Sequence, residues 1–374
     1  MKAVLDADVV VVGAGIVGLA HAWAATLRGL KVTVVERDYR CVGASIRNFG
    51  FVTVTGQRSG TTWERARRSR EHWAELAPRA GIPIEHRGLW VLARRPEARA
   101  VLEAFAQTPM GVGCALHSPE GAALRAPYLR AAGASAALYS PHELRVESRL
   151  AIPRLAEWLA MTHGVRFLFG ESVLDVAPPR ITTSRRLLRA ERVVICPGDA
   201  LTGPGAEHLA PHGLKLTRLQ MLRVMPATAG RLDAAVMSDL SLVRYRGYAD
   251  LPAAQTLHRR LDTESSAELA NGVHLIVVQA ADGSLVVGDS HHDACTPEPF
   301  ARADVDDLIL AEMQRVLELG ACRVVERWVG TYPTGPDQDA IVEAPDPATR
   351  VVVVCSGTGA STAFALAEDV FRDW

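Results

Sequence analysis

The sequence has no excess of charge of either sign. Its 374 residues include 41 Lys and Arg against 42 Asp and Glu, which leaves a formal net charge of −1. Without a basic excess, the chain lacks the electrostatic footprint that binds nucleic acid or an anionic membrane surface. Because 48% of the residues are hydrophobic and 22% are charged, the chain can build a packed core and is not disordered. We therefore expect a small molecule as its partner.

Lysines and cysteine motifs are scarce as well. Lysine occurs only at Lys2, Lys31 and Lys215, so the other basic residues are arginines, whose planar guanidinium groups suit phosphate or phosphonate oxygens. The six cysteines form no CxxC motif and are expected to be reduced core residues of a cytoplasmic protein. A charge-free run over residues 9–27 contains three glycines and His21. This pattern predicts a strand, a turn and a helix, and no membrane span.

The start of the chain contains a complete βαβ pattern. Residues 9–12 are a β-branched run typical of a parallel strand that is buried on both faces. Residues 13–18 read Gly-Ala-Gly-Ile-Val-Gly, apolar helix-forming residues follow, and a second strand is predicted over 32–35. Glu36 comes directly after that second strand. A GxGxxG motif with these flanks indicates a dinucleotide site.

Each residue of this motif has a physical task. Gly13 permits the tight turn, Gly15 lets the backbone approach a pyrophosphate, and Gly18 lets the helix pack closely against the strand. The N-terminus of the helix offers free N–H donors and a partial positive charge to the phosphates. Glu36 is expected to accept hydrogen bonds from the ribose hydroxyls of an adenosine.

Further patterns follow along the chain, and dinucleotide-type elements return near its end. The region over 214–287 is predicted to be rich in β-structure, with a hairpin turn at 282–283. Helices are predicted over 62–80, 96–107, 152–163 and 304–319; strands over 88–93, 165–168, 171–176, 192–196, 216–224, 243–248, 273–279, 285–288, 324–330 and 351–355; and a final helix after residues 357–362. The sequence thus predicts an α/β protein with a discontinuous two-domain design.

With both glycine segments in place, the chain resembles the FAD-dependent amine oxidases of the D-amino-acid oxidase, glycine oxidase and sarcosine oxidase superfamily. Residues 43–50, 145–149 and 288–292 are similar to a subgroup associated with the breakdown of aminophosphonates. The resemblance implies a Rossmann-like FAD-binding domain of the glutathione-reductase type and an interleaved, β-rich α+β substrate domain. The implied FAD-binding domain covers 1–83, 140–213 and 330–374, and the substrate domain covers 84–139 and 214–329.

The resemblance also implies which residues bind the cofactor. A loop after the second strand runs past the pyrophosphate towards the flavin, Val173 contacts the adenine, Gly198 lies beneath the cofactor, and residues 357–362 bring a helix N-terminus to the pyrimidine end of the flavin. FAD is expected to be non-covalent, because the cysteine nearest to the covalent-attachment position, Cys322, lies eight residues before Gly330. The implied FAD contacts are Gly13, Gly15, Gly18, Glu36, Arg37, Ala44, Ser45, Arg47, Asn48, Val173, Gly198, Gly357, Thr358, Gly359, Ala360, Ser361 and Thr362.

One departure from the superfamily concerns the substrate. Amino acid oxidases of this type carry an arginine that grips the substrate carboxylate, in a Trp-x-Gly-x-Arg-Pro-like stretch. Here residues 328–333 read Trp-Val-Gly-Thr-Tyr-Pro, so Tyr332 stands in place of the arginine. A bidentate grip from that position is lost, which makes a plain amino acid a poorer prediction for the substrate.

Histidines and aromatic residues are the predicted substrate contacts. One of His291 and His292 is expected to face the flavin pocket, and His274 falls near a substrate-facing position. Phe49 either covers the flavin or holds its loop in place. A metal site is not expected, because neighbouring residues of a strand point to opposite faces. The segment with Tyr245 and Tyr248 is interpreted as a polar edge strand.

The predicted activity is oxidation of a carbon–nitrogen bond. A small amine, such as 2-aminoethylphosphonate or an N-alkyl or hydroxy derivative, passes hydride to flavin N5, and the imine hydrolyses to a carbonyl product. No protein base is strictly required, and dioxygen is the expected acceptor, giving peroxide. The alternatives are an oxidase or dehydrogenase for a secondary amino acid such as sarcosine or proline, a flavoprotein without turnover, and an NAD enzyme, which the terminal glycine segment disfavours.

Overall fold

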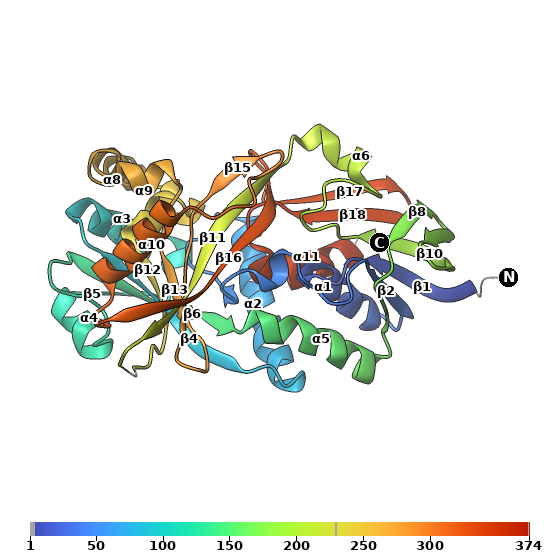
Figure 1. The fold of residues 1–374 in the computed structure, drawn as a ribbon, viewed down its shortest axis with the longest axis horizontal. Helices are drawn as coiled ribbons and strands as arrows, with labels where there is room; N and C mark the ends of the chain where they lie inside the picture. The colour runs from blue at the N-terminus through green and yellow to red at the C-terminus, as the bar shows by residue number, and fades with distance from the viewer. Residues whose placement is uncertain (1–3, 229, 373) are drawn as a thin grey trace.

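Two β-sheets form the body of the molecule, and helices pack around both (Figure 1). The computed structural model describes residues 4–228, 230–372 and 374. Figure 1 shows the first sheet at the right, near both chain ends, and most of the second sheet at the left. The mixed α/β class predicted from the sequence is confirmed. None of the described helices is long and apolar enough to cross a membrane.

The first sheet is built mainly from parallel strands. β1 (Val4–Val12) pairs in parallel with β2 (Val32–Glu36) on one side and with β10 (Leu187–Ile195) on the other. The remaining strands are β7 (Arg166–Phe169), β8 (Val173–Ala177), β9 (Arg180–Thr183), β17 (Ala340–Asp346) and β18 (Thr349–Val354). Their order is β17-β18-β10-β1-β2-β7, with β9 also paired to β10 and β8 to β9. The predicted βαβ unit therefore lies in the middle of this sheet.

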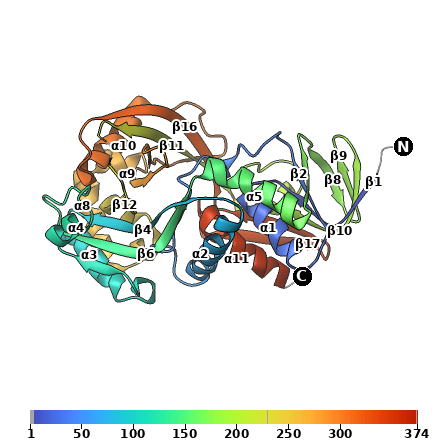
Figure 2. The same ribbon diagram turned by 90° about the horizontal axis from the view of Figure 1, so that it is seen from below.

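Both faces of the first sheet are covered, which explains its unbroken valine runs. Val9 and Val11 of β1 pack among the helices, whereas Val10 between them packs in a second core with residues of β8, β9 and β10. Figure 2 shows α11 between α2 and α1 below the sheet. The helices of this face are α1 (Ile16–Thr26), α2 (Thr61–Arg79), α5 (Ser148–His163) and α11 (Gly359–Arg372).

The second sheet is largely antiparallel. Its strands are β3 (Phe51–Val52), β4 (Ile84–Ala93), β5 (Ala115–His117), β6 (Ala136–Val146), β11 (Lys215–Pro226), β12 (Ala235–Ser238), β13 (Ile276–Gln279), β14 (Leu285–Gly288), β15 (His292–Ala294) and β16 (Cys322–Thr334). Their order is β15-β11-β14-β13-β12-β4-β6-β3, with β16 paired to β11 and β5 to β6. β6 and β16 run continuously through positions 140 and 330, where the sequence suggested domain boundaries.

Helices cover both faces of the second sheet as well. Ile276 and Val278 of β13 pack on the side of α3 (Pro96–Ala106) and α8 (Pro252–Glu264), and Val277 packs on the side of α10 (Ala303–Val316). This alternation is the period of two expected for a strand between two layers. The shorter elements are α4 (Pro119–Arg125), α6 (Ala206–Leu209), α7 (Arg246–Ala249), α9 (Ser266–Ala270), η1 (Ala44–Ile46), η2 (Pro109–Gly111), η3 (Ala210–His212) and η4 (Asp239–Val243).

The prediction of a strand over 243–248 is wrong. This segment leaves the 3₁₀-helix η4 and enters α7, and the carbonyl of Ser241 accepts hydrogen bonds from the backbone N–H groups of Arg244 (3.2 Å) and Tyr245 (3.0 Å). Gly247 then donates to the Gly56 carbonyl at 2.9 Å, in a contact so close that a Cβ would lie 2.4 Å from a backbone oxygen. These contacts override the alternating apolar pattern. The helices α8 and α9 were also missed in a region predicted to be β-rich.

Candidate active site

A single continuous cavity runs between the two sheets, from the N-terminus of α1 to the β13 and β14 end of the second sheet. Side chains and backbone of both sheets line it. Of the residues predicted from the sequence, it is lined by Gly15, Gly18, Ala44, Ser45, Arg47, Asn48, Phe49, Gly198, His274, His291, Tyr332, Gly357, Thr358, Gly359, Ala360 and Ser361. The structure therefore brings together residues that lie up to 346 positions apart (Gly15 and Ser361, 361 − 15).

The glycine turn at the start of α1 has no room for side chains. Gly13 has a φ of +100°, and a Cβ on it would lie 2.4 Å from the carbonyl oxygen of Cys196, the residue that follows β10. A Cβ on Gly18 would lie 1.9 Å from the Gly13 carbonyl oxygen. Glycine is thus required here by close packing. The first N–H groups of α1 have no partner within the helix, and Gly15, Val17 and Gly18 of this turn line the cavity.

The loop around η1 is shaped by its own polar side chains. Ser45 Oγ accepts a hydrogen bond from the backbone N–H of Ile16 at 2.9 Å, which ties this loop to the start of α1. The amide of Asn48 donates to the Ala44 carbonyl (2.9 Å) and accepts from the N–H of Gly50 (2.7 Å). The backbone carbonyl of Arg47 accepts from the Trp328 indole at 3.1 Å. These residues fix the position of the loop along the cavity wall.

Six of the predicted residues lie outside the cavity lining. Glu36 accepts hydrogen bonds from the backbone N–H groups of Ala14 (2.8 Å) and Asp38 (3.0 Å), so its carboxylate braces the glycine turn. Arg37 is exposed and lies 3.6 Å from Asp38. The Thr362 hydroxyl donates to the Thr358 carbonyl within its own helix. The six residues are Gly13, Glu36, Arg37, Val173, His292 and Thr362.

The N-terminus of α11 also lines the cavity, beside the start of α1, where the position of a Cβ on Gly359 lies 3.6 Å from Ile16 Cγ2. The buried Trp73 of α2 donates its indole N–H to the Ala360 carbonyl at 2.8 Å. Ser361 Oγ accepts from the backbone N–H of Thr53 at 2.9 Å. Gly357, with a φ of +71°, approaches the Tyr332 ring so closely that a Cβ would lie 3.1 Å from it. A second set of helical N–H groups is thereby aimed into the cavity.

Arg244 supplies the cation that position 332 lacks. Its guanidinium lines the cavity and donates to the Tyr332 hydroxyl at 3.4 Å. Among residues 4–228, 230–372 and 374, it forms no ion pair with a carboxylate. The sequence analysis missed Arg244 as a site residue, because it placed this segment in an edge strand. Tyr245, also assigned there to a solvated strand, lines the cavity as well, and burial raises the pKa of its hydroxyl.

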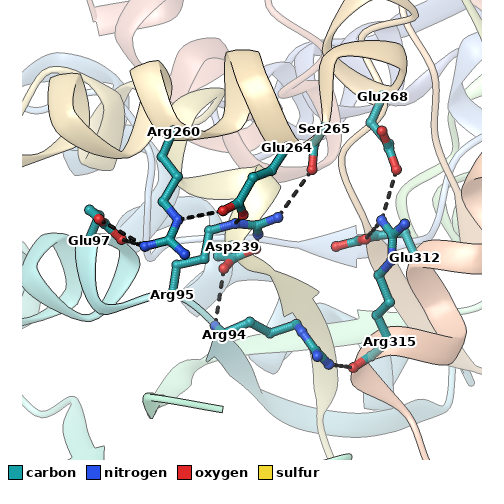
Figure 3. A network of polar contacts seen from close by, with 10 residues as sticks. All are labelled: Arg94, Arg95, Glu97, Asp239, Arg260, Glu264, Ser265, Glu268, Glu312 and Arg315. Carbon is teal, nitrogen blue, oxygen red and sulfur yellow. Dashed lines mark hydrogen bonds and ion pairs between the residues drawn. The ribbon is translucent and has the colours of Figure 1, made fainter. Parts of the chain in front are cut away.

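A network of ion pairs surrounds Asp239 at the start of η4, the segment that leads to Arg244 (Figure 3). Asp239 is fully buried; its carboxylate accepts from Arg95 Nη1 at 2.9 Å and from the backbone N–H of Arg94 at 3.1 Å. Arg95 also pairs with Glu264 of α8 at 2.8 Å. The segment that carries Arg244 is therefore anchored to both β4 and α8. No local sequence pattern around Asp239 signals these contacts.

Two histidines face each other across a buried carboxylate in the cavity wall. Nε2 of His274 lies 3.1 Å from Asp289 Oδ1, and Nε2 of His291 lies 3.7 Å from Asp289 Oδ2. His292, the first residue of β15, lies outside the cavity lining, with Nε2 3.2 Å from the Asn271 side-chain oxygen. Of the two neighbouring histidines, the structure therefore places only His291 in the cavity wall. From the sequence, Asp289 was considered only as a possible metal ligand and not as a residue of the substrate site.

Phe49 lines the cavity. It is 8% exposed and packs in the core of the second sheet, and its ring tip lies 3.3 Å from the position of a Cβ on Gly288. The site that results has helix N-termini and glycine backbone at one end and Arg244, Tyr332, His274, Asp289 and His291 at the other.

The profile of the family described as FAD dependent oxidoreductase matches residues 8–372. The chain belongs to this family of FAD-dependent oxidoreductases. It is an enzyme, and its cofactor is FAD. A comparison with curated protein sequences finds no match.

Solved structures of several oxidoreductases share the fold. Glycine oxidase from Geobacillus kaustophilus has a TM-score of 0.79 at 19% identity, covering 99% of this chain and 94% of that chain. Glycine oxidase from Bacillus cereus ATCC 14579 has a TM-score of 0.78 at 17% identity, covering 98% and 96%. L-proline dehydrogenase from P. horikoshii has a TM-score of 0.77 at 18% identity, covering 99% and 95%. At these identities the likeness establishes the fold of this FAD-dependent oxidoreductase.

The residues of the oxidoreductase fit the cofactor of its family. A glycine turn without side chains lets a pyrophosphate approach the backbone, and the start of α1 offers it N–H donors. The start of α11, fixed by Trp73 and Thr53, offers a positive helix end to a ring that gains negative charge when it is reduced. Both features line the same cavity.

Proposed function

We propose that this enzyme oxidises the carbon–nitrogen bond of a small amine that carries an anionic group, specifically an aminophosphonate such as 2-aminoethylphosphonate or an N-alkyl or hydroxy derivative. FAD, when bound, accepts the electron pair and hydrogen that leave the substrate. The imine product hydrolyses to a carbonyl compound and an amine or ammonia, and dioxygen takes the electrons and gives peroxide. The chain's own residues bind and orient the two ends of the substrate.

Arg244 is the observation that carries this proposal. An arginine that lines the cavity without a carboxylate partner among the described residues is a binding group for an anion from outside the chain. The Tyr332 hydroxyl lies beside it at 3.4 Å, where both groups can donate to one anion. Three acceptor oxygens of a phosphonate can use the fork of an arginine and a hydroxyl together.

Enclosure of the reacting groups supports the same activity. Tyr332, His274 and Asp289 are all largely shielded from solvent, and Phe49 is 8% exposed. An anion and an amine held at fixed positions in such a cavity leave the carbon between them little freedom, which is the main contribution that positioning makes to a hydride transfer.

A second candidate is the oxidation of an amino carboxylate. The planar fork of Arg244 also matches a carboxylate, and the solved structures of the same fold include two glycine oxidases and an L-proline dehydrogenase. Tyr332 in place of an arginine and the tyrosine-rich surroundings of Arg244 favour the phosphonate.

A matched substrate panel tests the proposal. The holoenzyme is mixed anaerobically with 2-aminoethylphosphonate, N-methyl-2-aminoethylphosphonate, β-alanine, sarcosine and propylamine, and loss of the flavin absorbance is followed. We expect the phosphonates to reduce the flavin fastest and propylamine slowest. If only the carboxylates reduce the flavin, the second candidate is the correct one. If propylamine reduces the flavin as fast as the anionic amines, the anionic group has no role. Peroxide formation on admission of air tests the acceptor.

A further inference from the structure

The His274, Asp289 and His291 side chains form a buried cluster that has no role in the oxidation proposed above. One imidazole nitrogen of each histidine and the carboxylate of Asp289 lie within 4.8 Å of one another. His274 is 4% and Asp289 5% exposed, and all three residues line the cavity that also contains Arg244. Asp289 Oδ1 has no hydrogen-bond partner among the described residues. A buried carboxylate oxygen in this state lacks a donor.

The far side of the His291 imidazole fixes which of its nitrogens faces the carboxylate as an acceptor. Nδ1 of His291 lies 3.0 Å from the carbonyl oxygen of Gly272, and a carbonyl can only accept, so Nδ1 carries the hydrogen. In the neutral ring, Nε2 therefore turns a lone pair towards Asp289. For His274, Nδ1 lies 3.3 Å from Ser241 Oγ, and Nε2 lies 3.1 Å from Asp289 Oδ1.

The charges of the cluster agree with this arrangement. Burial lowers the pKa of His291 to about 3, against the opposing effect of Asp289, so this ring is neutral. The pKa of Asp289 is raised by burial but lowered overall by its neighbours, among which Arg244 carries a permanent positive charge. Tyr245 and Tyr332 also face the cluster, and burial raises the pKa of both hydroxyls, so neither adds a negative charge. The cluster is anionic and consists of acceptors.

The cation that fits these acceptors carries N–H groups. The two imidazole rings are stacked, with centroids 5.0 Å apart and planes 21° apart. An imidazole binds a metal ion along the lone pair in the plane of its ring, and two nearly parallel rings are a poor arrangement for one shared ion. Arg244 in the same cavity further disfavours a divalent cation. An ammonium group has separate hydrogens for separate acceptors.

We propose that Asp289, His274 and His291 bind the ammonium group of the substrate and that the Asp289–His291 pair accepts its proton. This inference rests on the proposed function and adds a base to it. An N–H bond of the ammonium breaks, its electron pair stays on nitrogen as the lone pair needed for oxidation, and the proton moves to the Asp289 carboxylate, which shares it with Nε2 of His291. The cluster then changes its charge from −1 to 0.

The anion of the substrate assists this proton transfer. Arg244 is one of the groups that lower the pKa of His291. When a phosphonate neutralises the charge of Arg244, that effect is offset, and the proton affinity of His291 rises. When the amine carries no anionic group, the charge of Arg244 is not neutralised, and the pKa of His291 stays low. Arg244 and the cluster thus act on opposite ends of one zwitterion.

The test compares Asp289→Asn with Asp293→Asn. Asp293 lies outside the cavity lining and accepts from the Thr217 hydroxyl at 2.6 Å, an acceptor role that asparagine can keep. The rate constant of anaerobic flavin reduction by 2-aminoethylphosphonate is measured between pH 6.5 and 9.5. We expect it to be nearly constant in the wild type and in Asp293→Asn. In Asp289→Asn it should be about 100- to 1000-fold lower at pH 7.

The pH profile separates a base from a structural support. Without the base, only the free amine reacts, so the rate constant of Asp289→Asn should rise about tenfold per pH unit towards the ammonium pKa of about 10. His291→Asn should show the same slope with a smaller loss. Calorimetric titration with 2-hydroxyethylphosphonate, which has no ammonium group, should give the same Kd in Asp289→Asn and wild type, within a factor of two.

Each contrary result has a distinct meaning. If no amine reduces the wild-type flavin, the proposed function fails before the base is tested. If the wild type is reduced and Asp289→Asn keeps both its rate and its flat profile, the base is refuted. A loss of 2-hydroxyethylphosphonate binding in Asp289→Asn would likewise refute a specific role for the ammonium. Purified holoenzyme with one metal ion per chain, lost in Asp289→Asn, would assign the cluster to a metal ion instead.

Discussion

The two ends of the cavity are built in different ways. At the end that we propose for FAD, here called the FAD end, the wall consists of glycines, helix N-termini and a loop that is held by Ser45 and Asn48. At the end that we propose for the substrate, here called the substrate end, it consists of side chains from separate segments, namely Arg244, His274, Asp289 and Tyr332. The first end depends on the absence of side chains and the second on their charge. We therefore expect steric changes to damage the first end and charge changes to damage the second.

The largest effect is expected from Gly13→Ala at the FAD end. Its Cβ would lie 2.4 Å from the Cys196 carbonyl oxygen, which belongs to the backbone and cannot move aside. We expect protein without FAD and a loss of about 3 kcal/mol or more in the free energy of unfolding. The ratio of flavin to protein absorbance and a denaturant titration measure both.

Gly29→Ala is the matched control for this change. Gly29 also has a positive φ, +74°, but nothing lies within 4 Å of its Cβ position. It should lose only about 1 kcal/mol, the cost of a left-handed residue, and keep its FAD. Equal loss of FAD in both variants would show that the backbone conformation, and not close packing, governs this end.

Asp239→Asn should weaken the substrate end from a distance. It removes the charge that holds Arg95 and thereby loosens the segment that carries Arg244. We expect a loss of about 2 to 3 kcal/mol in the free energy of unfolding, because a buried pair loses one partner, and a raised KM with FAD retained. Asp262→Asn in the exposed pair with His258 should change either quantity little. An unchanged KM in Asp239→Asn would show that the position of η4 does not affect substrate binding.

Arg244→Gln tests the charge of the substrate end directly. It removes charged hydrogen bonds of about 1.5 to 3 kcal/mol, so kcat/KM for an anionic amine should fall about 10- to 150-fold. Activity towards a neutral amine should not fall, and the FAD content should stay the same. Arg99→Gln, which breaks an exposed pair with Glu103 outside the cavity lining, is the control. A similar loss for anionic and neutral amines would argue against anion binding by Arg244.

The smallest effect is expected from Tyr332→Phe. The ring stays against Gly357, and only the hydroxyl beside Arg244 is lost. A hydrogen bond of about 0.5 to 1.5 kcal/mol corresponds to a rise in KM of about two- to tenfold. Steady-state kinetics with the best substrate of the panel measure it. No change in KM would leave Arg244 as the sole anion donor of the pair.

The comparison also explains what the sequence could predict. The βαβ unit and the final helix follow from local patterns, since a glycine turn and valine runs carry their own physical requirements. The choice between His291 and His292 depends on where β15 begins, at His292, which the local pattern does not show. Arg244 was hidden because an alternating apolar pattern predicted a strand where contacts with Ser241 and Gly56 form helical turns.

Long-range partners account for the remaining errors. Asp239 is buried by its pairing with Arg95, 144 residues away in the sequence, and Asp289 meets His274 across a backbone pairing. Such contacts leave no periodic signal near either residue. Buried charges of this kind are instead found by asking which partner compensates them.

A crystal structure of the anaerobically reduced holoenzyme with 2-aminoethylphosphonate tests the central claim most directly. We expect the phosphonate oxygens within hydrogen-bond distance of the Arg244 guanidinium and the Tyr332 hydroxyl, and the amine nitrogen within hydrogen-bond distance of Asp289. A substrate bound in the cavity with its anion away from Arg244, or with its nitrogen away from Asp289, would contradict the account.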